Sequence, residues 1–148
     1  MKCMAEILAI RLEAEMEYQA EQKRLDEEAN LKLLERIEKT IQFCETTINK
    51  HFEEQAKRRV TNFYYDTKCV VEKDRLGNKQ IILLDIDSVR YANGDISKSP
   101  SATKRYDYET LINYLAQFCY KLEFTDSSYK TYGSGSHKCL ILTVKFAD

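Results

Sequence analysis

Asp85 and Asp87 are two residues whose types and spacing could do chemistry. They follow the apolar run IILL in a segment predicted to form a strand, where residues two apart point to the same face. Their carboxylates could therefore share a divalent cation. A metal-dependent nuclease would also need a third acidic group and a nearby lysine, and neither has a suitable spacing here. A polar strand face is the favoured interpretation.

His137 and Cys139 are likewise two apart on a predicted strand, an arrangement that two zinc ligands could use. No second ligand pair accompanies them, and the other histidine, His51, lies on a predicted helix beside Phe52. Two histidines are also too few to activate five thiols as nucleophiles. We predict no catalytic residue, no metal and no cofactor.

A glycine-rich segment, Tyr132 to Ser136, resembles a phosphate-binding loop in composition. A Walker loop, however, ends in Gly-Lys-Ser/Thr and opens a helix, whereas this segment joins two predicted strands. We predict a flexible hairpin turn, whose glycines would let a ligand approach the backbone closely.

Tyrosine is the most informative residue type, because nine of the ten tyrosines follow residue 60 and several adjoin cations. Tyrosine suits protein interfaces and nucleobase stacking, although strand propensity explains the enrichment equally well. Two loops, 97–106 and 129–137, combine these groups on a predicted rigid scaffold. The predicted ligand- or partner-binding residues are Arg90, Tyr91, Arg105, Tyr106, Tyr129, Tyr132, Gly133, Ser134 and Gly135.

The elements that must position these residues begin with a long helix. The first sixty residues contain no Gly or Pro and are rich in helix formers, which predicts a helix from Met4 to about Arg59. Such a helix would be roughly 80 Å long, whereas the rest of the chain can form a globule only about 25–30 Å across. It must therefore pair with a second copy, or fold back as a hairpin at a break in Asp26–Asn30.

The predicted helix carries two apolar stripes. The first comprises Ile7, Ile10, Ala14 and Tyr18. The second, stronger stripe comprises Leu34, Ile37, Ile41, Cys44, Ile48, Phe52 and Ala56. We predict that the second stripe docks on the domain and that residues 4–30 mediate self-association. Residues 1–30 carry four basic and eight acidic side chains and residues 31–60 seven and five, a gradient that suits antiparallel helix pairing or a solvated helix.

The remainder predicts an α+β fold, with strands over 60–71, 80–91, 122–130 and 138–146. A turn is expected over 74–79, and a helix capped by Asp107 is expected over 108–120. The predicted architecture is a long N-terminal helix, coiled-coil in character, followed by a four-stranded, largely antiparallel sheet with one helix packed on it. The predicted domains are an oligomerisation segment, 1–59, and a small α+β domain, 60–148.

Composition restricts the class of protein. The formal net charge of −1 gives no general attraction to nucleic acid or to anionic membranes. The five cysteines include no C-x-x-C pair, no signal peptide is recognisable, and no apolar run approaches the roughly 20 residues of a membrane span. We therefore expect a cytoplasmic protein with free thiols and no membrane partner.

The order of elements resembles that of small, mostly uncharacterised phage and prophage proteins. The corresponding segments are Ile37 to Ala56, Val60 to Val71, Tyr108 to Tyr120, Tyr120-Lys121-Leu122 and Leu140 to Phe146. The sequence departs from that pattern at Cys119, where a glycine is usual, and at 74–105, which holds an extra strand and loop. The resemblance implies an intracellular accessory protein of a kind that could counter host defence, and it supplies no catalytic residue.

The predicted function is a phage-type binding protein that inhibits or sequesters a host factor or a small nucleotide, without catalysis and as a homo-oligomer. The alternative is a nucleic-acid-binding accessory protein that uses Arg58, Arg59, Lys104 and Arg105 at the sheet edge. A metal-dependent nuclease centred on Asp85 and Asp87 is the third hypothesis.

Overall fold

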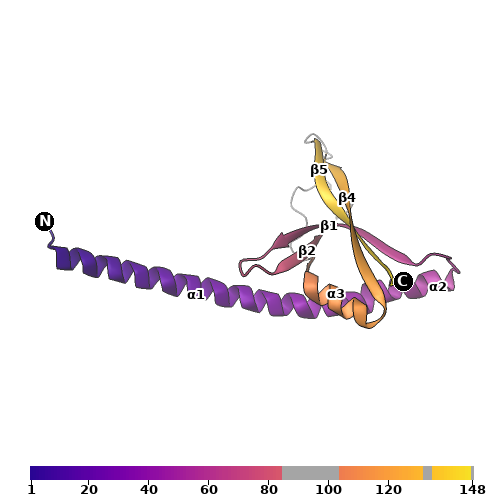
Figure 1. The fold of residues 1–148 in the computed structure, drawn as a ribbon, viewed down its shortest axis with the longest axis horizontal. Coiled ribbons are helices and arrows are strands. Elements are labelled where there is room, and N and C mark those ends of the chain that lie inside the picture. Colours follow the sequence, from indigo (N-terminus) through magenta and orange to yellow (C-terminus); the bar gives the residue numbers. More distant parts are fainter. Residues whose placement is uncertain (85–103, 132–134, 148) are drawn as a thin grey trace, which may run out of the picture.

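The structure, a computed structural model, describes residues 1–84, 104–131 and 135–147. It is α+β, with one long helical rod followed by an antiparallel sheet and a further helix (Figure 1). The rod consists of α1 (Met4–Phe43), a π-helical turn (Cys44–Ile48) and α2 (Asn49–Lys57). It runs past the sheet and far beyond it, so that the N-terminus projects away from the rest of the molecule (Figure 1). The prediction of one long helix is confirmed, and the hairpin with a break at residues 26–30 is wrong.

The rod ends where its backbone turns left-handed. Arg59 has φ of 56°, and the amides of Arg58 and Val60 donate to the carbonyls of Glu54 and Gln55. A left-handed residue after the last turn is the usual way to satisfy terminal carbonyls, and glycine commonly occupies it. Because this helix has no glycine to use, an arginine takes the conformation.

The sheet has five strands in the order β3-β2-β1-β5-β4. The strands are β1 (Tyr64–Lys73), β2 (Lys79–Leu83), β3 (Arg105–Asp107), β4 (Tyr120–Thr131) and β5 (Gly135–Phe146), and every neighbouring pair is antiparallel. The predicted count of four strands is therefore wrong by one. The extra strand is β3, which pairs Tyr106 with Ile81 and Arg105 with Ile82. Its three residues are too few to show a strand pattern.

Two locally encoded features are confirmed. In the β1–β2 turn, Oδ1 of Asp74 accepts hydrogen bonds from the amides of Leu76 and Asn78, each at 2.9 Å. Gly77 supplies the positive φ, at 86°, that this turn requires. Asp107 caps α3 (Tyr108–Gln117) by accepting a hydrogen bond of 3.0 Å from the amide of Thr110.

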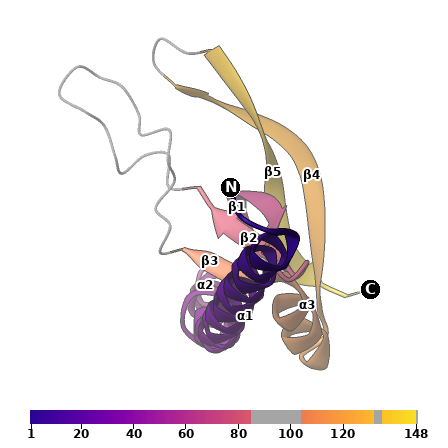
Figure 2. The same cartoon turned by 90° about the vertical axis from the view of Figure 1, so that its left-hand side faces the viewer.

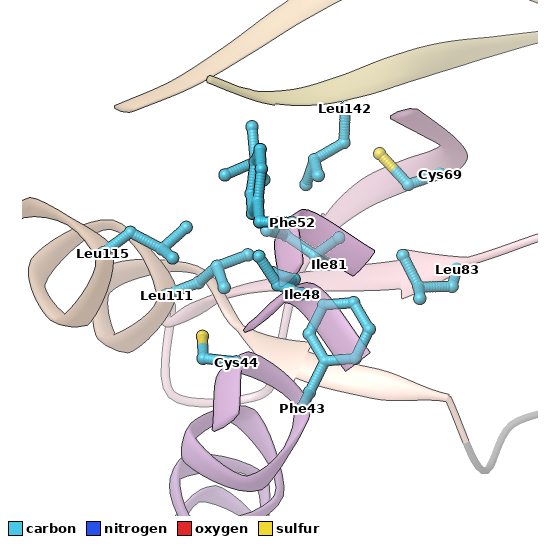
Figure 3. Close-up of a cluster of buried hydrophobic side chains, with 11 residues drawn as sticks. Phe43, Cys44, Ile48, Phe52, Cys69, Ile81, Leu83, Leu111, Leu115 and Leu142 are labelled. Atoms are coloured by element: carbon cyan, nitrogen blue, oxygen red, sulfur yellow. The ribbon is translucent and has the colours of Figure 1, made fainter. Parts of the chain in front are cut away.

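The core lies between one face of the sheet and the helices. The rod and α3 run side by side on that face (Figure 2). Figure 3 shows how the rod contributes Phe43, Cys44, Ile48 and Phe52 to a cluster with Leu111 and Leu115 of α3 and with residues of the strands. The buried cluster comprises Phe43, Cys44, Ile48, Phe52, Cys69, Ile81, Leu83, Leu111, Leu115, Leu142 and Val144.

The buried face of the rod differs from the predicted stripe. Cys44, Ile48 and Phe52 are buried as expected, but Leu34 is 63 % exposed. The buried residues that precede Cys44 are Arg36, Thr40 and Phe43. The cause is the π turn, whose i→i+5 hydrogen bonds accommodate one extra residue and rotate the buried face at this point.

Thiol reactivity provides a test of this core. Burial, with a smaller contribution from Glu45, raises the pKa of Cys44 to about 12, and burial beside Cys139 raises the pKa of Cys69 to about 12. Cys139 is buried too, whereas Cys3 and Cys119 are exposed. Because the thiolate is the reactive species, Ellman's reagent at neutral pH should modify two of the five thiols rapidly and the other three only on unfolding. Rapid modification of four or more would contradict this packing.

Candidate functional site

A groove of about 540 Å³ lies between α1 and the edge of the sheet. Its volume is within the range of small-molecule sites. Four elements line it: α1, the β1–β2 turn, β2 and β3. The lining residues are Leu25, Glu28, Ala29, Lys32, Glu35, Arg36, Lys39, Asp74, Arg75, Gln80 and Arg105.

Two arginines fix the β1–β2 turn against the helix and so form one wall of the groove. Nε of Arg75 donates to Oδ1 of Asp26 at 2.9 Å, and its Nη2 donates to Gln22. Nη2 of Arg36 donates to Oδ2 of Asp74 at 2.5 Å. The turn is thereby tied to α1 at points more than two helical turns apart.

The Arg36–Asp74 pair is the buried part of this wall, with side chains 10 % and 8 % exposed. Burial disfavours the ionised form of Asp74. The hydrogen bonds from Arg36 and from the amides of Asn78 and Leu76 outweigh that effect, so the pKa of Asp74 lies below its ordinary value. The Asp74 carboxyl therefore remains ionised at neutral pH.

One buried polar donor of the groove remains unused. Nε of Arg36 is buried without a hydrogen-bond partner. Gln80 also lines the groove and is 8 % exposed, but its side-chain atoms are not among the buried polar atoms that lack a partner. A buried polar group without a partner costs about 1–3 kcal/mol. A bound acceptor would remove that cost.

The charges of the groove favour an anion. Its lining carries five cations and three carboxylates, and two of these carboxylates are already paired, Asp74 with Arg36 and Glu28 with Arg24. Within the described chain, Lys32, Lys39 and Arg105 make no ion pair, and Glu35 is the one lining carboxylate without a cationic partner. Three free cations therefore face one free carboxylate.

Those predicted binding residues that the structure describes do not come together in one site. Arg105 lines the groove. Tyr106, the next residue of β3, stacks on Phe43 with ring centroids 4.3 Å apart, and burial raises its pKa. Tyr129 of β4 stacks on His137 of β5, with ring centroids 5.1 Å apart. The strand β4 is the edge of the sheet opposite to β3. Gly135 begins β5. Arg90, Tyr91, Tyr132, Gly133 and Ser134 lie outside the described residues.

The predicted nucleic-acid patch is divided. Arg58 and Arg59 follow the end of α2. Arg105, by contrast, is on β3, which lies beside Thr40 of α1: the amide of Asp107 on β3 donates a hydrogen bond of 2.8 Å to Oγ1 of Thr40. Eighteen residues of helix separate Thr40 from Arg58, or roughly 27 Å at 1.5 Å per residue. The four cations therefore do not form one patch.

The metal hypotheses gain no support from the described residues. Asp85 and Asp87 lie outside them. His137 stacks on Tyr129, and Cys139 is buried. Within 1–84, 104–131 and 135–147, no group of three or more metal-ligating side chains is present.

Comparisons of the chain with protein-family models, with curated proteins and with solved structures find no match. In the part of the chain that the structure describes, no helix has both the length and the apolar character needed to cross a membrane.

Proposed function

We propose that this chain is a non-catalytic binding protein that self-associates through the free part of α1 and sequesters a small anionic ligand, such as a nucleotide, in the groove. The observation that carries the proposal is the unused buried donor, Nε of Arg36, among an excess of cations. Phosphate oxygens accept strong hydrogen bonds from such groups. The role of a phage-type accessory protein remains part of the proposal on the basis of the sequence resemblance.

The groove favours a small ligand over an extended nucleic acid. The three lining cations that make no ion pair among the described residues are confined to one concave site, while Arg58 and Arg59, which follow α2, lie a long way along the rod. A nucleic acid would contact phosphates over a wider surface and would release many counterions, so that its affinity would fall steeply with salt. A nucleotide held by a few groups should show a shallower dependence.

Calorimetric titration tests the groove, with inorganic phosphate, AMP, ATP and a single-stranded oligonucleotide as probes. Arg105→Ala should weaken binding of the preferred probe about tenfold or more, because one charge-assisted hydrogen bond is worth about 1.5–3 kcal/mol. Gln80→Leu should also weaken it, because an amide that lines the groove is lost. The melting temperature should change little, because leucine is an apolar group of similar size.

The matched control is Arg58→Ala, which removes the same charge from an exposed position outside the groove. It should leave the affinity nearly unchanged. Equal weakening by Arg58→Ala and Arg105→Ala would indicate unspecific attraction, and failure of every probe to bind would overturn the anionic ligand.

A further inference from the structure

The N-terminal part of α1 has no partner within its own chain. Residues 1–21 are all exposed, and the helix first meets the domain at Gln22, through Arg75. Figure 1 shows this segment projecting from the molecule. Seven large apolar side chains on it are between 47 % and 78 % exposed: Met4, Ile7, Leu8, Ile10, Leu12, Met16 and Tyr18.

A second observation extends this apolar surface beyond the free segment. Leu31 and Leu34 are each 63 % exposed, although α1 already packs on the domain at these positions. They continue a row that runs along the helix in steps of 4, 4, 3, 4, 4 and 3 residues. We call this row the outer seam, and its members are Leu12, Met16, Ala20, Lys23, Glu27, Leu31 and Leu34, all exposed.

The outer seam lies on the side of α1 away from the domain. The residues that are buried or partly buried over the same stretch are Gln22, Leu25, Ala29, Leu33 and Arg36. At about 100° per residue these positions occupy the opposite side of the helix. A second helix could therefore pack on the outer seam without meeting its own domain, and the heptad-like steps are those of a coiled coil.

We infer that the outer seam binds the outer seam of a second copy in antiparallel orientation, centred near Lys23. In that register Leu12 faces Leu34 of the partner subunit and Met16 faces Leu31 of the partner subunit. By two-fold symmetry each pair occurs twice, which gives four apolar layers. The inference deepens the self-association in the proposed function and does not depend on the ligand.

The length and charge of the helix support this orientation. Centred near Lys23, the free segment 4–21 lies beside roughly residues 25–43 of the partner, so the whole free segment is covered over an overlap of roughly 58 Å. Residues 4–21 carry five glutamates and one arginine, a net charge of −4, whereas residues 25–43 carry five acidic and three basic side chains, a net of −2. Parallel pairing would place two segments of −4 side by side, which is less favourable.

The centre of the seam also favours antiparallel pairing. Lys23 and Glu27 make no ion pair within the described chain. In the antiparallel dimer each Lys23 lies about one helical turn from Glu27 of the partner subunit, so opposite charges can meet across the interface. In a parallel dimer Lys23 would face Lys23 of the partner subunit and Glu27 would face Glu27 of the partner subunit, so that like charges would meet.

Disulfide trapping tests the register, in chains whose exposed thiols are removed by Cys3→Ser and Cys119→Ser. A Leu12→Cys chain mixed with a Leu34→Cys chain should form a mixed disulfide, and Lys23→Cys alone should cross-link to itself. Leu12→Cys alone should not cross-link, because its two copies would lie roughly 33 Å apart along the axis.

Light scattering on the unmodified chain accompanies the trapping and should give the mass of a dimer. A dimer in which Leu12→Cys cross-links to itself and not to Leu34→Cys would be parallel, and it would overturn the inference while leaving self-association in place. A monomer at all concentrations would overturn both. Neither result bears on anion binding in the groove, which the titrations test separately.

Discussion

Replacing Phe43 with alanine is expected to lower the free energy of unfolding by about 3–5 kcal/mol. The side chain is 6 % exposed, and its ring stacks on Tyr106 at 4.3 Å and meets Tyr65 edge-on at 6.0 Å. Alanine would remove these contacts and leave a cavity between the rod and the sheet. Urea unfolding should show a lower midpoint with little change in slope, because the surface exposed on unfolding is nearly the same.

Phe118→Ala is the matched control, since it is the same chemical change at a side chain that is 55 % exposed. It should cost no more than about 1 kcal/mol, because little apolar surface is lost from the interior. If Phe43→Ala proved as mild as Phe118→Ala, the rod would not bury this face against the sheet. The core described for the protein would then be wrong.

Features set by neighbouring residues were predictable from the sequence. The extent of the rod follows from the absence of Gly and Pro before residue 60. The Asp107 cap and the Asp74 turn depend on hydrogen bonds to amides within four residues, so their signals are local. Cys119 does not belong with these features: its φ is 65°, and a left-handed conformation at a residue other than glycine has no local signal in the sequence.

Features set by distant residues were not predictable. The buried face of the rod rotates at a π turn that has no sequence signature, so the expected stripe failed at Leu34. Burial of Arg36 is possible only because Asp74, 38 residues later, neutralises it. The strand β3 exists because β2 offers a free edge and Thr40 accepts the hydrogen bond of the Asp107 amide. Each depends on tertiary contacts that single-residue propensity does not contain.

The candidate site likewise contains one residue that the sequence predicted and others that it did not. Arg105 was predicted because it adjoins a tyrosine at the end of a loop, and it does line the groove. Gln80 and Arg36 gave no comparable signal, since a polar residue beside an apolar run is ordinary. The groove is assembled from a helix, a turn and two strands, and only the fold brings Gln80 and Arg36 together in its lining.

Separating Arg36 from Asp74 is expected to destabilise the protein by about 3–5 kcal/mol, because the remaining charge would stay buried without its partner. Asp74→Asn is the informative variant. It keeps an oxygen able to accept from the amides of Leu76 and Asn78 and removes only the charge, whereas Asp74→Ala would also break the turn. Combining it with Arg36→Met should restore much of the stability, since neither buried charge remains, and the double-mutant cycle measures the coupling.

The pH dependence of stability provides an independent test of the same pair. The pKa of Asp74 in the folded protein lies below its ordinary value of 3.8. Its contribution to stability is therefore complete above the ordinary value and is lost as the pH falls through the lower, folded-state value. Urea unfolding between pH 6 and pH 2 compares the free energies of unfolding of the parent and Asp74→Asn. Their difference should shrink below about pH 4, because the Asp74 carboxyl of the parent then binds a proton in the unfolded state more readily than in the folded state. A difference that stayed constant over this range would mean that the Asp74 carboxylate is not held ionised by Arg36, and the wall of the groove would need another explanation.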